Sequence, residues 1–331
     1  AATPMPFPGY DAIVPPSAAT TAKVLRENGY ATMAIGKWDH VPTQYVSPAG
    51  PFNLWPSGQG FERFYGFMSY ETDNFAPTLY RDHTPLVHKE FPAGYHLSAD
   101  MADEAVRFIN SLRSSGTQKP FYLYWATGAN HAPHHAPAEW IAKFKGQFDM
   151  GWDAYHREVF ARQKRMGIVP SHARLPARPA ELPAWSSLSP AEKRLYARQM
   201  EVFAAQIAHA DFEFGRILDR LESDGSLDNT LVIVTSDNGA TAEGGMAGLS
   251  NATSIINGRT QTFTDNNPFY DKWGGPETAP HYHSGWAFAG NTPYRYYKHT
   301  AHLGGRQVPT IISWPKGIQR GGEVRTQYQH L

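Results

Sequence analysis

Residues 231–239 read LVIVTSDNG, an apolar run that passes directly into a polar turn. A short run of this kind is typical of a strand buried on both faces of a parallel sheet. Two earlier runs have the same form: Tyr30–Ile35 ends at Gly36-Lys37, and Phe121–Trp125 precedes a polar loop that contains His131. Ligands of open α/β sheets bind beyond the carboxyl ends of the strands. The turns that follow these three runs are therefore the predicted site.

Segments with helical periodicity alternate with the apolar runs, and they cover residues 17–28, 98–113 and 189–223. The last of them opens with the capping box Ser189-Pro190-Ala191-Glu192. Residues 38–96 and 240–285 show no helical period and are predicted as loops, while Thr310–Trp314 is predicted as one more short strand. This alternation predicts an α/β fold with a mixed, largely parallel central sheet flanked by helices.

The composition narrows the classes of function. Hydrophobic residues make up 41% and charged residues 18% of the chain, which is typical of a globular protein. Thirty basic residues balance thirty acidic ones, which argues against a nucleic-acid partner held by bulk charge. The absence of cysteine excludes disulfides and thiol catalysis within the chain. No apolar run reaches the length of a transmembrane segment. The composition fits an exported bacterial protein and a cytosolic protein equally.

The turn after the third run has the chemistry of a metal site. Asp237 and Asn238 place a carboxylate and an amide oxygen side by side, and Gly239 permits a tight turn. Such oxygen ligands suit a hard cation, Ca²⁺ or Mg²⁺. The same three residues, taken alone, more often close a strand as an Asx turn.

Histidine and lysine side chains follow the other strands. Two prolines after His131, at positions 133 and 137, stiffen its loop and make it a candidate general acid, whereas His134 and His135 are predicted to lie on a surface loop. Lys37 and Lys298 would supply positive charge to a sulfuryl or phosphoryl group near a cation. Each of these residues alone is more often structural than catalytic.

Taken together and in this order, the segments resemble the type I sulfatases of the alkaline-phosphatase-like superfamily, in particular the bacterial arylsulfatase branch. The resemblance extends over nearly the whole chain, and the matching stretches are Ser17–Lys37, Pro51–Gly66, His131–Trp140, Leu231–Gly239 and Asn291–Gly305.

The resemblance implies a sulfuric ester hydrolase that acts on a small-molecule sulfate ester. Its nucleophile would be a formylglycine, produced from Cys or Ser in a C/S-x-P-x-R motif by a formylglycine-generating enzyme. Asp237 and Asn238 would be Ca²⁺ ligands, with Mg²⁺ as the alternative. Lys37 and Lys298 would bind the sulfate oxygens, and His131 would bind or protonate the leaving-group oxygen.

The sequence departs from the family pattern in three places. The family histidine two residues after the Lys37 position is replaced by Asp39, and His40 follows; a shifted loop would let His40 take that role. The C/S-x-P-x-R motif is absent from the 331 residues, as are the family's early Asp-Asp metal ligands. Residues 1–10 resemble the segment that follows the nucleophile helix.

From these departures we expect residues 1–331 to be the central part of a sulfatase catalytic domain, incomplete at both ends, with formylglycine upstream. A basic, Pro-rich surface excursion is expected at about residues 150–186. We expect this chain by itself to be poorly soluble and inactive. Two alternatives stay open: a phosphonate or phosphate monoester hydrolase of the same superfamily, and a non-catalytic binding protein on a sulfatase scaffold.

Overall fold

The computed structural model describes residues 13–87, 90–117, 119–255 and 257–327. The contacts divide it into two compact units. Unit 1 runs to Trp140 and adds Gln206–Ile217, and unit 2 comprises Ile141–Ala205 and the chain from Leu218 onward. Residues 1–10 and 329–331, on which the expected truncation partly rests, lie outside the described residues. The expectation of one catalytic domain stays a prediction.

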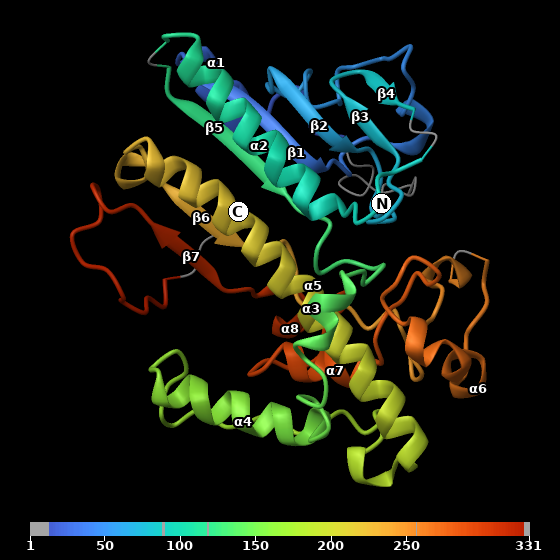
Figure 1. Ribbon diagram of the computed structural model, residues 1–331. Coiled ribbons are helices and arrows are strands. Elements are labelled where there is room, and N and C mark those ends of the chain that lie inside the picture. Colours follow the sequence, from blue (N-terminus) through green and yellow to red (C-terminus); the bar gives the residue numbers. More distant parts are fainter. Residues whose placement is uncertain (1–12, 88–89, 118, 256, 328–331) are drawn as a thin grey trace. The chain divides into compact units, whose positions relative to one another are not determined.

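Unit 1 is built on a five-stranded sheet with the order β4-β3-β2-β1-β5 (Figure 1). The strands are β1 (Ala31–Lys37), β2 (Arg63–Phe67), β3 (Leu79–Arg81), β4 (Thr84–Leu86) and β5 (Phe121–Ala126). β1 pairs in parallel with β2 on one side and with β5 on the other, whereas β3 and β4 add antiparallel pairings. The predicted mixed sheet with parallel central pairing is therefore confirmed.

Helices cover this sheet, and the helices expected at residues 17–28 and 98–113 both form. α1 (Thr21–Glu27) is capped by the Thr20 hydroxyl, so it begins later than the sequence predicted. α2 (Leu97–Ser114) buries Met101, Ala105 and Ile109 and lies along β1 and β2 (Figure 1). The short α3 (Ala138–Ala142) follows the loop that contains His131.

The prediction that residues 38–96 are only loop is wrong, because β2, β3 and β4 lie within them. β3 and β4 are three residues long, too short to show an alternating pattern. β2 reads RFYGF, and its glycine is unusual within a strand. Pairing with β1, a contact between segments distant in sequence, is what makes these residues strands.

The glycine in β2 allows a close approach to β1. Gly66 is the register partner of Gly36, and a Cβ added at Gly66 would lie 1.9 Å from the Gly36 carbonyl oxygen. A Cβ at Gly36 would lie 2.0 Å from the carbonyl oxygen of Ala126 in β5, and Gly36 has φ +101°. Only glycine fits at these two positions, which stand at the carboxyl ends of the parallel strands.

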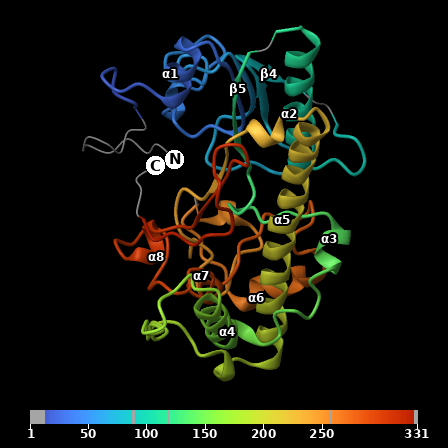
Figure 2. The same ribbon diagram turned by 90° about the vertical axis from the view of Figure 1, so that its left-hand side faces the viewer.

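Unit 2 combines a two-stranded sheet with helices. Its elements are α4 (Gly151–Arg165), most of α5 (Pro190–Ser223), β6 (Val232–Thr235), α6 (Phe263–Asn266), α7 (Ser284–Gly290), α8 (Leu303–Arg306) and β7 (Thr310–Ser313). Short 3₁₀ helices cover Trp185–Ser187, Leu227–Asn229, Ala252–Ser254 and Asn267–Lys272, and one in unit 1 covers Thr43–Tyr45. The capping box predicted at Ser189 and Glu192 is present at the start of α5, whose length is clearest in Figure 2.

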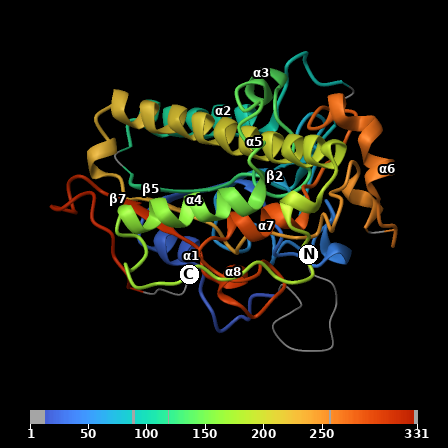
Figure 3. The ribbon, with the colours of Figure 1, turned by 90° about the horizontal axis from the view of Figure 1, so that it is seen from below.

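The expected surface excursion at residues 150–186 packs part of itself into unit 2. α4 lies against α7 (Figure 3), with Trp152, His156 and Phe160 buried. The Trp152 ring stacks on His283 at 4.5 Å between centroids and meets Trp286 edge-on at 5.8 Å. Arg157, Arg162 and Arg165 of α4 are exposed, and such basic residues are what suggested a surface segment.

The predicted burial of residues 231–235 is wrong in this structure. β6 pairs antiparallel with β7, and the side chains of Ile233 and Ile311 are 52% and 66% exposed. Apolar β-branched residues identified the strand correctly, but burial depends on what packs over it.

Among the described residues, no helix is both long and apolar enough to cross a membrane.

We predict opposite effects for two glycine-to-alanine changes in unit 1. Gly66→Ala should lower the free energy of unfolding by about 2–3 kcal/mol, because the new methyl group overlaps the backbone of β1. Gly215→Ala, in the middle of α5 with no atom within 4 Å of the added Cβ, should raise it by about 0.5–1 kcal/mol. Urea unfolding of both variants measures the difference. Equal effects would contradict the close approach of β1 and β2.

Candidate active site

Two of the candidate residues of unit 1 follow neighbouring parallel strands. Lys37 ends β1, and His131 lies in the loop after β5. Parallel strands that are adjacent in a sheet end at the same edge, so both residues belong to the carboxyl-end edge of this sheet. The Lys37 ammonium lies 3.9 Å from the Asp39 carboxylate, with both side chains about one-fifth exposed. His40 is exposed, and its ring packs edge-on against Trp38 at 4.9 Å.

The His131 ring has a defined tautomer. Its Nδ1 lies 2.9 Å from the carbonyl oxygen of Ala132, and because a carbonyl only accepts, Nδ1 must carry a proton. Nε2 is therefore the acceptor nitrogen of the neutral ring, where His131 can take up a proton and release it again. A Glu71 carboxylate oxygen lies 3.8 Å from Nδ1, and the Tyr70 ring packs against the imidazole. The preceding Asn130 has φ 75°, a left-handed conformation that asparagine tolerates, and it turns the chain into the loop.

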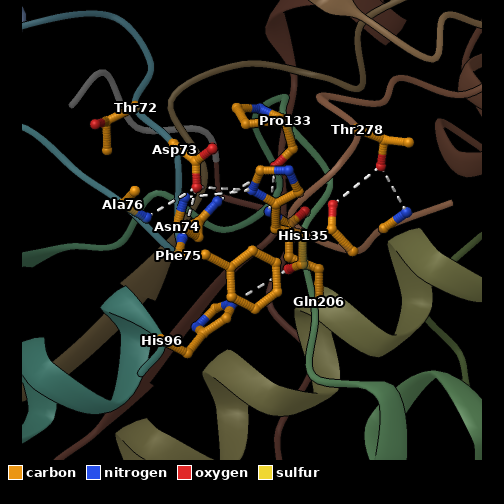
Figure 4. Close-up of polar contacts among 12 residues, drawn as sticks. Thr72, Asp73, Asn74, Phe75, Ala76, His96, Pro133, His135, Gln206 and Thr278 are labelled. Atoms are coloured by element: carbon orange, nitrogen blue, oxygen red, sulfur yellow. Dashed lines mark hydrogen bonds and ion pairs between the residues drawn. The ribbon is translucent and has the colours of Figure 1, made fainter. Parts of the chain in front are cut away.

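The prediction that His134 and His135 lie on a surface loop is wrong, since both side chains are 0% exposed. The backbone N–H of Asn74 donates to Nδ1 of His135 at 3.3 Å. Nε2 of His96 donates to the His135 carbonyl at 3.3 Å (Figure 4). Nδ1 of His96 accepts from the N–H of Ser98 at the start of α2. His135 therefore attaches the loop to unit 1, and neither His134 nor His135 is on the surface.

The candidate residues of unit 2 are held in one set of loops. Asp237 and Asn238 follow β6, the aspartate side chain being exposed. Two residues on, the N–H of Ala240 donates to the Asn291 side-chain oxygen at 2.8 Å. The carbonyl of Ala240 accepts from the N–H of Lys298 at 2.9 Å. Unit 2 thus ties the turn that carries Asp237 and Asn238 to the segment that carries Lys298.

Asp237 and Asn238 have the chemistry of ligands for a hard cation, but they supply only part of the number of ligands that such a cation needs. A carboxylate and an amide oxygen are ligands that Ca²⁺ prefers, but this ion takes about six to eight oxygens. Among the described residues, no group of three or more His, Asp or Glu side chains gathers as a metal site. These two residues would therefore hold a cation together with ligands from elsewhere.

Comparison with known proteins identifies the family. A family model described as Sulfatase matches residues 6–331. The chain belongs to the sulfatase family. This sulfatase is 32% identical over 329 residues to an uncharacterized sulfatase of Schizosaccharomyces pombe, covering 94% of this chain and 56% of the relative. It is 28% identical over 323 residues to an arylsulfatase of Klebsiella aerogenes, covering 96% of this chain and 66% of the relative.

A solved structure supports the fold. The crystal structure of Ps i-CgsB matches 90% of this sulfatase and is itself covered to 47%, with a TM-score of 0.51 and 18% sequence identity. At that identity the likeness concerns the fold alone. The chain spans about half to two thirds of the length of the relatives it matches.

Sequence reasoning missed four residues that contact the His131 loop of this sulfatase, and they are Glu71, Asn74, His96 and Gln206. The first two lie in a segment predicted as featureless loop. One signal was present for Gln206: it falls on the apolar face of α5, between Phe203 and Ala210, where a polar side chain needs a partner.

Two buried histidines of the sulfatase have strongly lowered pKa values. Burial lowers the pKa of His96 to about 3, and the neighbouring His209 adds to the effect. Burial also lowers the pKa of His283, in unit 2, to about 3. Both rings are therefore neutral in the folded protein at any pH near neutrality, which matches the two hydrogen bonds that fix the tautomer of His96.

We predict acid-sensitive stability from these two histidines. In the unfolded chain a histidine titrates near pH 6.5, so between pH 6.5 and about 3 the unfolded state binds more protons. Stability should consequently fall as the pH decreases through this range, by up to about 1.4 kcal/mol per pH unit for each histidine. Urea unfolding at a series of pH values measures the slope. His96→Gln and His283→Gln should each make it shallower, and an unchanged slope would show that these rings are protonated in the folded state.

Proposed function

We propose that the protein containing these residues is a sulfuric ester hydrolase of the arylsulfatase type that cleaves sulfate monoesters. The observation that carries the proposal is the match of the family model to residues 6–331. The positions of Lys37 and His131 beyond adjacent parallel strands agree with it, because this edge is where α/β folds bind their ligands.

Each candidate residue has a role in this proposal. Lys37 and Lys298 bind the sulfate oxygens and offset negative charge that develops during cleavage. In its doubly protonated form His131 donates the Nε2 proton to the leaving-group oxygen as the sulfur–oxygen bond breaks and returns to the neutral ring, whose Nδ1–H stays bonded to the Ala132 carbonyl. His40 remains the candidate for the family's other histidine role.

Two groups from outside these residues complete the proposed site. A cation, Ca²⁺ or Mg²⁺, would be held by Asp237 and Asn238 with further ligands, and would supply positive charge beside the sulfate group. A formylglycine hydrate, installed by a formylglycine-generating enzyme, would supply the oxygen nucleophile. None of the six residues discussed above is a nucleophile for sulfur, so the proposed chemistry needs this group.

One observation favours the alternative of a binding protein on the sulfatase scaffold. Asp39 lies 3.9 Å from Lys37 and offsets part of the charge that a sulfate group would meet there. Asp39→His, which restores the family residue, separates the alternatives. In a hydrolase this variant should keep or raise kcat/KM for an aryl sulfate; in a binding protein it should create no turnover.

The proposed cation site predicts the metal content. A purified protein that contains both units and the remaining ligands should hold about one Ca²⁺ or Mg²⁺ per chain by elemental analysis. Asp237→Ala should abolish this retention because it removes the charged ligand. The control is Asp228→Ala, which removes an exposed carboxylate from the turn before β6 and should leave metal content unchanged. Equal metal content in both variants would return residues 237–239 to an ordinary turn.

The role of His131 predicts a dependence on the leaving group. His131→Ala should reduce kcat/KM for an alkyl sulfate by about 100-fold or more, because a poorly acidic alcohol needs a proton to depart. For an activated aryl sulfate, whose phenolate leaves readily, the loss should be less than about tenfold. The exposed His172, changed to Ala, is the control and should behave as wild type. Equal losses on both substrates would mean that His131 binds sulfate and does not act as an acid.

A further inference from the structure

Side-chain amides from two separate segments hold one carbonyl in the His131 loop. The carbonyl oxygen of Pro133 accepts from Nε2 of Gln206, on α5, at 3.1 Å and from Nδ2 of Asn74, in the segment after β2, at 3.3 Å. The N–H of His135 donates to the same oxygen at 2.9 Å. Figure 4 shows the Asn74 and Gln206 side chains converging on this part of the loop. All these residues belong to unit 1.

Gln206 reaches the catalytic candidate itself. Besides Pro133, its Nε2 lies 3.4 Å from the carbonyl oxygen of His131. The residue is 1% exposed, and its Oε1 is buried without a hydrogen-bond partner among the described residues. Burying an acceptor without a partner costs stability. The hydrogen bonds that Nε2 donates to the two carbonyls therefore explain why an amide side chain stands here. A hydrophobic residue would fill the same space on the apolar face of α5 without that cost.

Asn74 connects the loop to the rest of unit 1. It is 3% exposed, and its backbone N–H, its backbone carbonyl and its side-chain Nδ2 all form hydrogen bonds. Its N–H donates to His135 and its Nδ2 to Pro133, while its carbonyl accepts from the N–H of Leu97, the first residue of α2, at 2.8 Å. The loop is therefore held from the β2 side and from α5 at the same carbonyl.

We propose that Gln206 and Asn74 are positioning residues that set the direction of the His131 imidazole; the catalytic part of this inference rests on the proposed sulfatase function. The Nδ1–H of His131 donates to the carbonyl of Ala132, the residue before Pro133. The direction of that carbonyl depends on the backbone between His131 and Pro133, and Gln206 bonds to the carbonyl at each end of this stretch. The two amides thereby fix both the tautomer of His131 and the direction in which its Nε2 points.

A positioning role for Gln206 can be distinguished from a purely structural role by comparison with another buried glutamine. A buried glutamine can stabilise a protein without influencing His131, and the same helix provides the matched example. Gln199, also on α5, is 0% exposed and makes two buried hydrogen bonds, to the Ala247 carbonyl and from the N–H of His283. It lies in unit 2 and has no contact with the His131 loop among the hydrogen bonds of the described residues. Gln206→Met and Gln199→Met remove comparable buried amides.

The first test needs no activity and uses the protein that contains both units and the remaining ligands. With ¹⁵N-labelled histidine, long-range ¹H–¹⁵N spectra report which ring nitrogen of each neutral histidine carries the proton, and His131→Asn assigns the signals. Wild type and Gln199→Met should show His131 protonated at Nδ1. Gln206→Met and Asn74→Ala should show a mixture of both tautomers. An Nδ1-protonated His131 in both of these variants would overturn the proposal, whatever their stability.

The second test uses the protein together with a formylglycine nucleophile. Gln206→Met should reduce kcat/KM for an alkyl sulfate by up to about 100-fold, with a smaller loss for an activated aryl sulfate, since only the proton donor is displaced. Gln199→Met should affect both substrates equally and modestly. If Gln206→Met instead loses activity equally on both substrates, the positioning role is wrong.

The two tests fail separately. A wild-type protein that hydrolyses no sulfate ester would overturn the proposed function, and the spectra would still decide whether the amides set the His131 tautomer. Conversely, a working sulfatase in which Gln206→Met matches Gln199→Met in spectra and in substrate profile would leave the proposed function standing and overturn the positioning role. Thermal unfolding of all variants confirms that each is compared in its folded state.

Discussion

The parallel pairing of β1 with both β2 and β5 is the constraint on which the rest of unit 1 depends. Gly36 and Gly66 make this pairing possible, because a side chain at either residue would overlap the backbone of the neighbouring strand. Parallel pairing brings the carboxyl ends of three strands to one edge. The segments that leave that edge carry Lys37, Glu71 and the His131 loop. The close backbone approach at the two glycines therefore determines where these polar residues lie.

Beyond the strand ends, hydrogen bonds to backbone groups take over from packing. In unit 1, Asn74 and Gln206 hold the Pro133 carbonyl. In unit 2, the Asn291 side chain holds the Ala240 N–H, next to the turn that carries the proposed cation ligands. Side-chain amides suit this work because they donate and accept without carrying charge, and therefore leave the local field to the lysines and histidines.

Neutral histidines form a second internal support. His96 both caps α2 and donates to the His135 carbonyl, so its ring links a helix terminus to the His131 loop. Burial keeps the pKa of this ring low, which preserves the acceptor nitrogen that the cap requires. In a fold of this kind a histidine-rich loop does not imply a metal site: of the three histidines at 131–135, two serve the framework and one is the candidate acid.

The sequence by itself determined the elements with strong local signals: the α5 capping box, the apolar strands, and the residue types that follow those strands. These depend on neighbours in the chain, and they carried the family resemblance as well. Only the tertiary structure decided the short strands β2–β4, the burial of His134 and His135, the exposure of β6, and the contacts of Asn74 and Gln206 with the loop. Each of these depends on a partner far away in sequence, and the free energy of burying or pairing a group is set by that partner, which no local pattern contains.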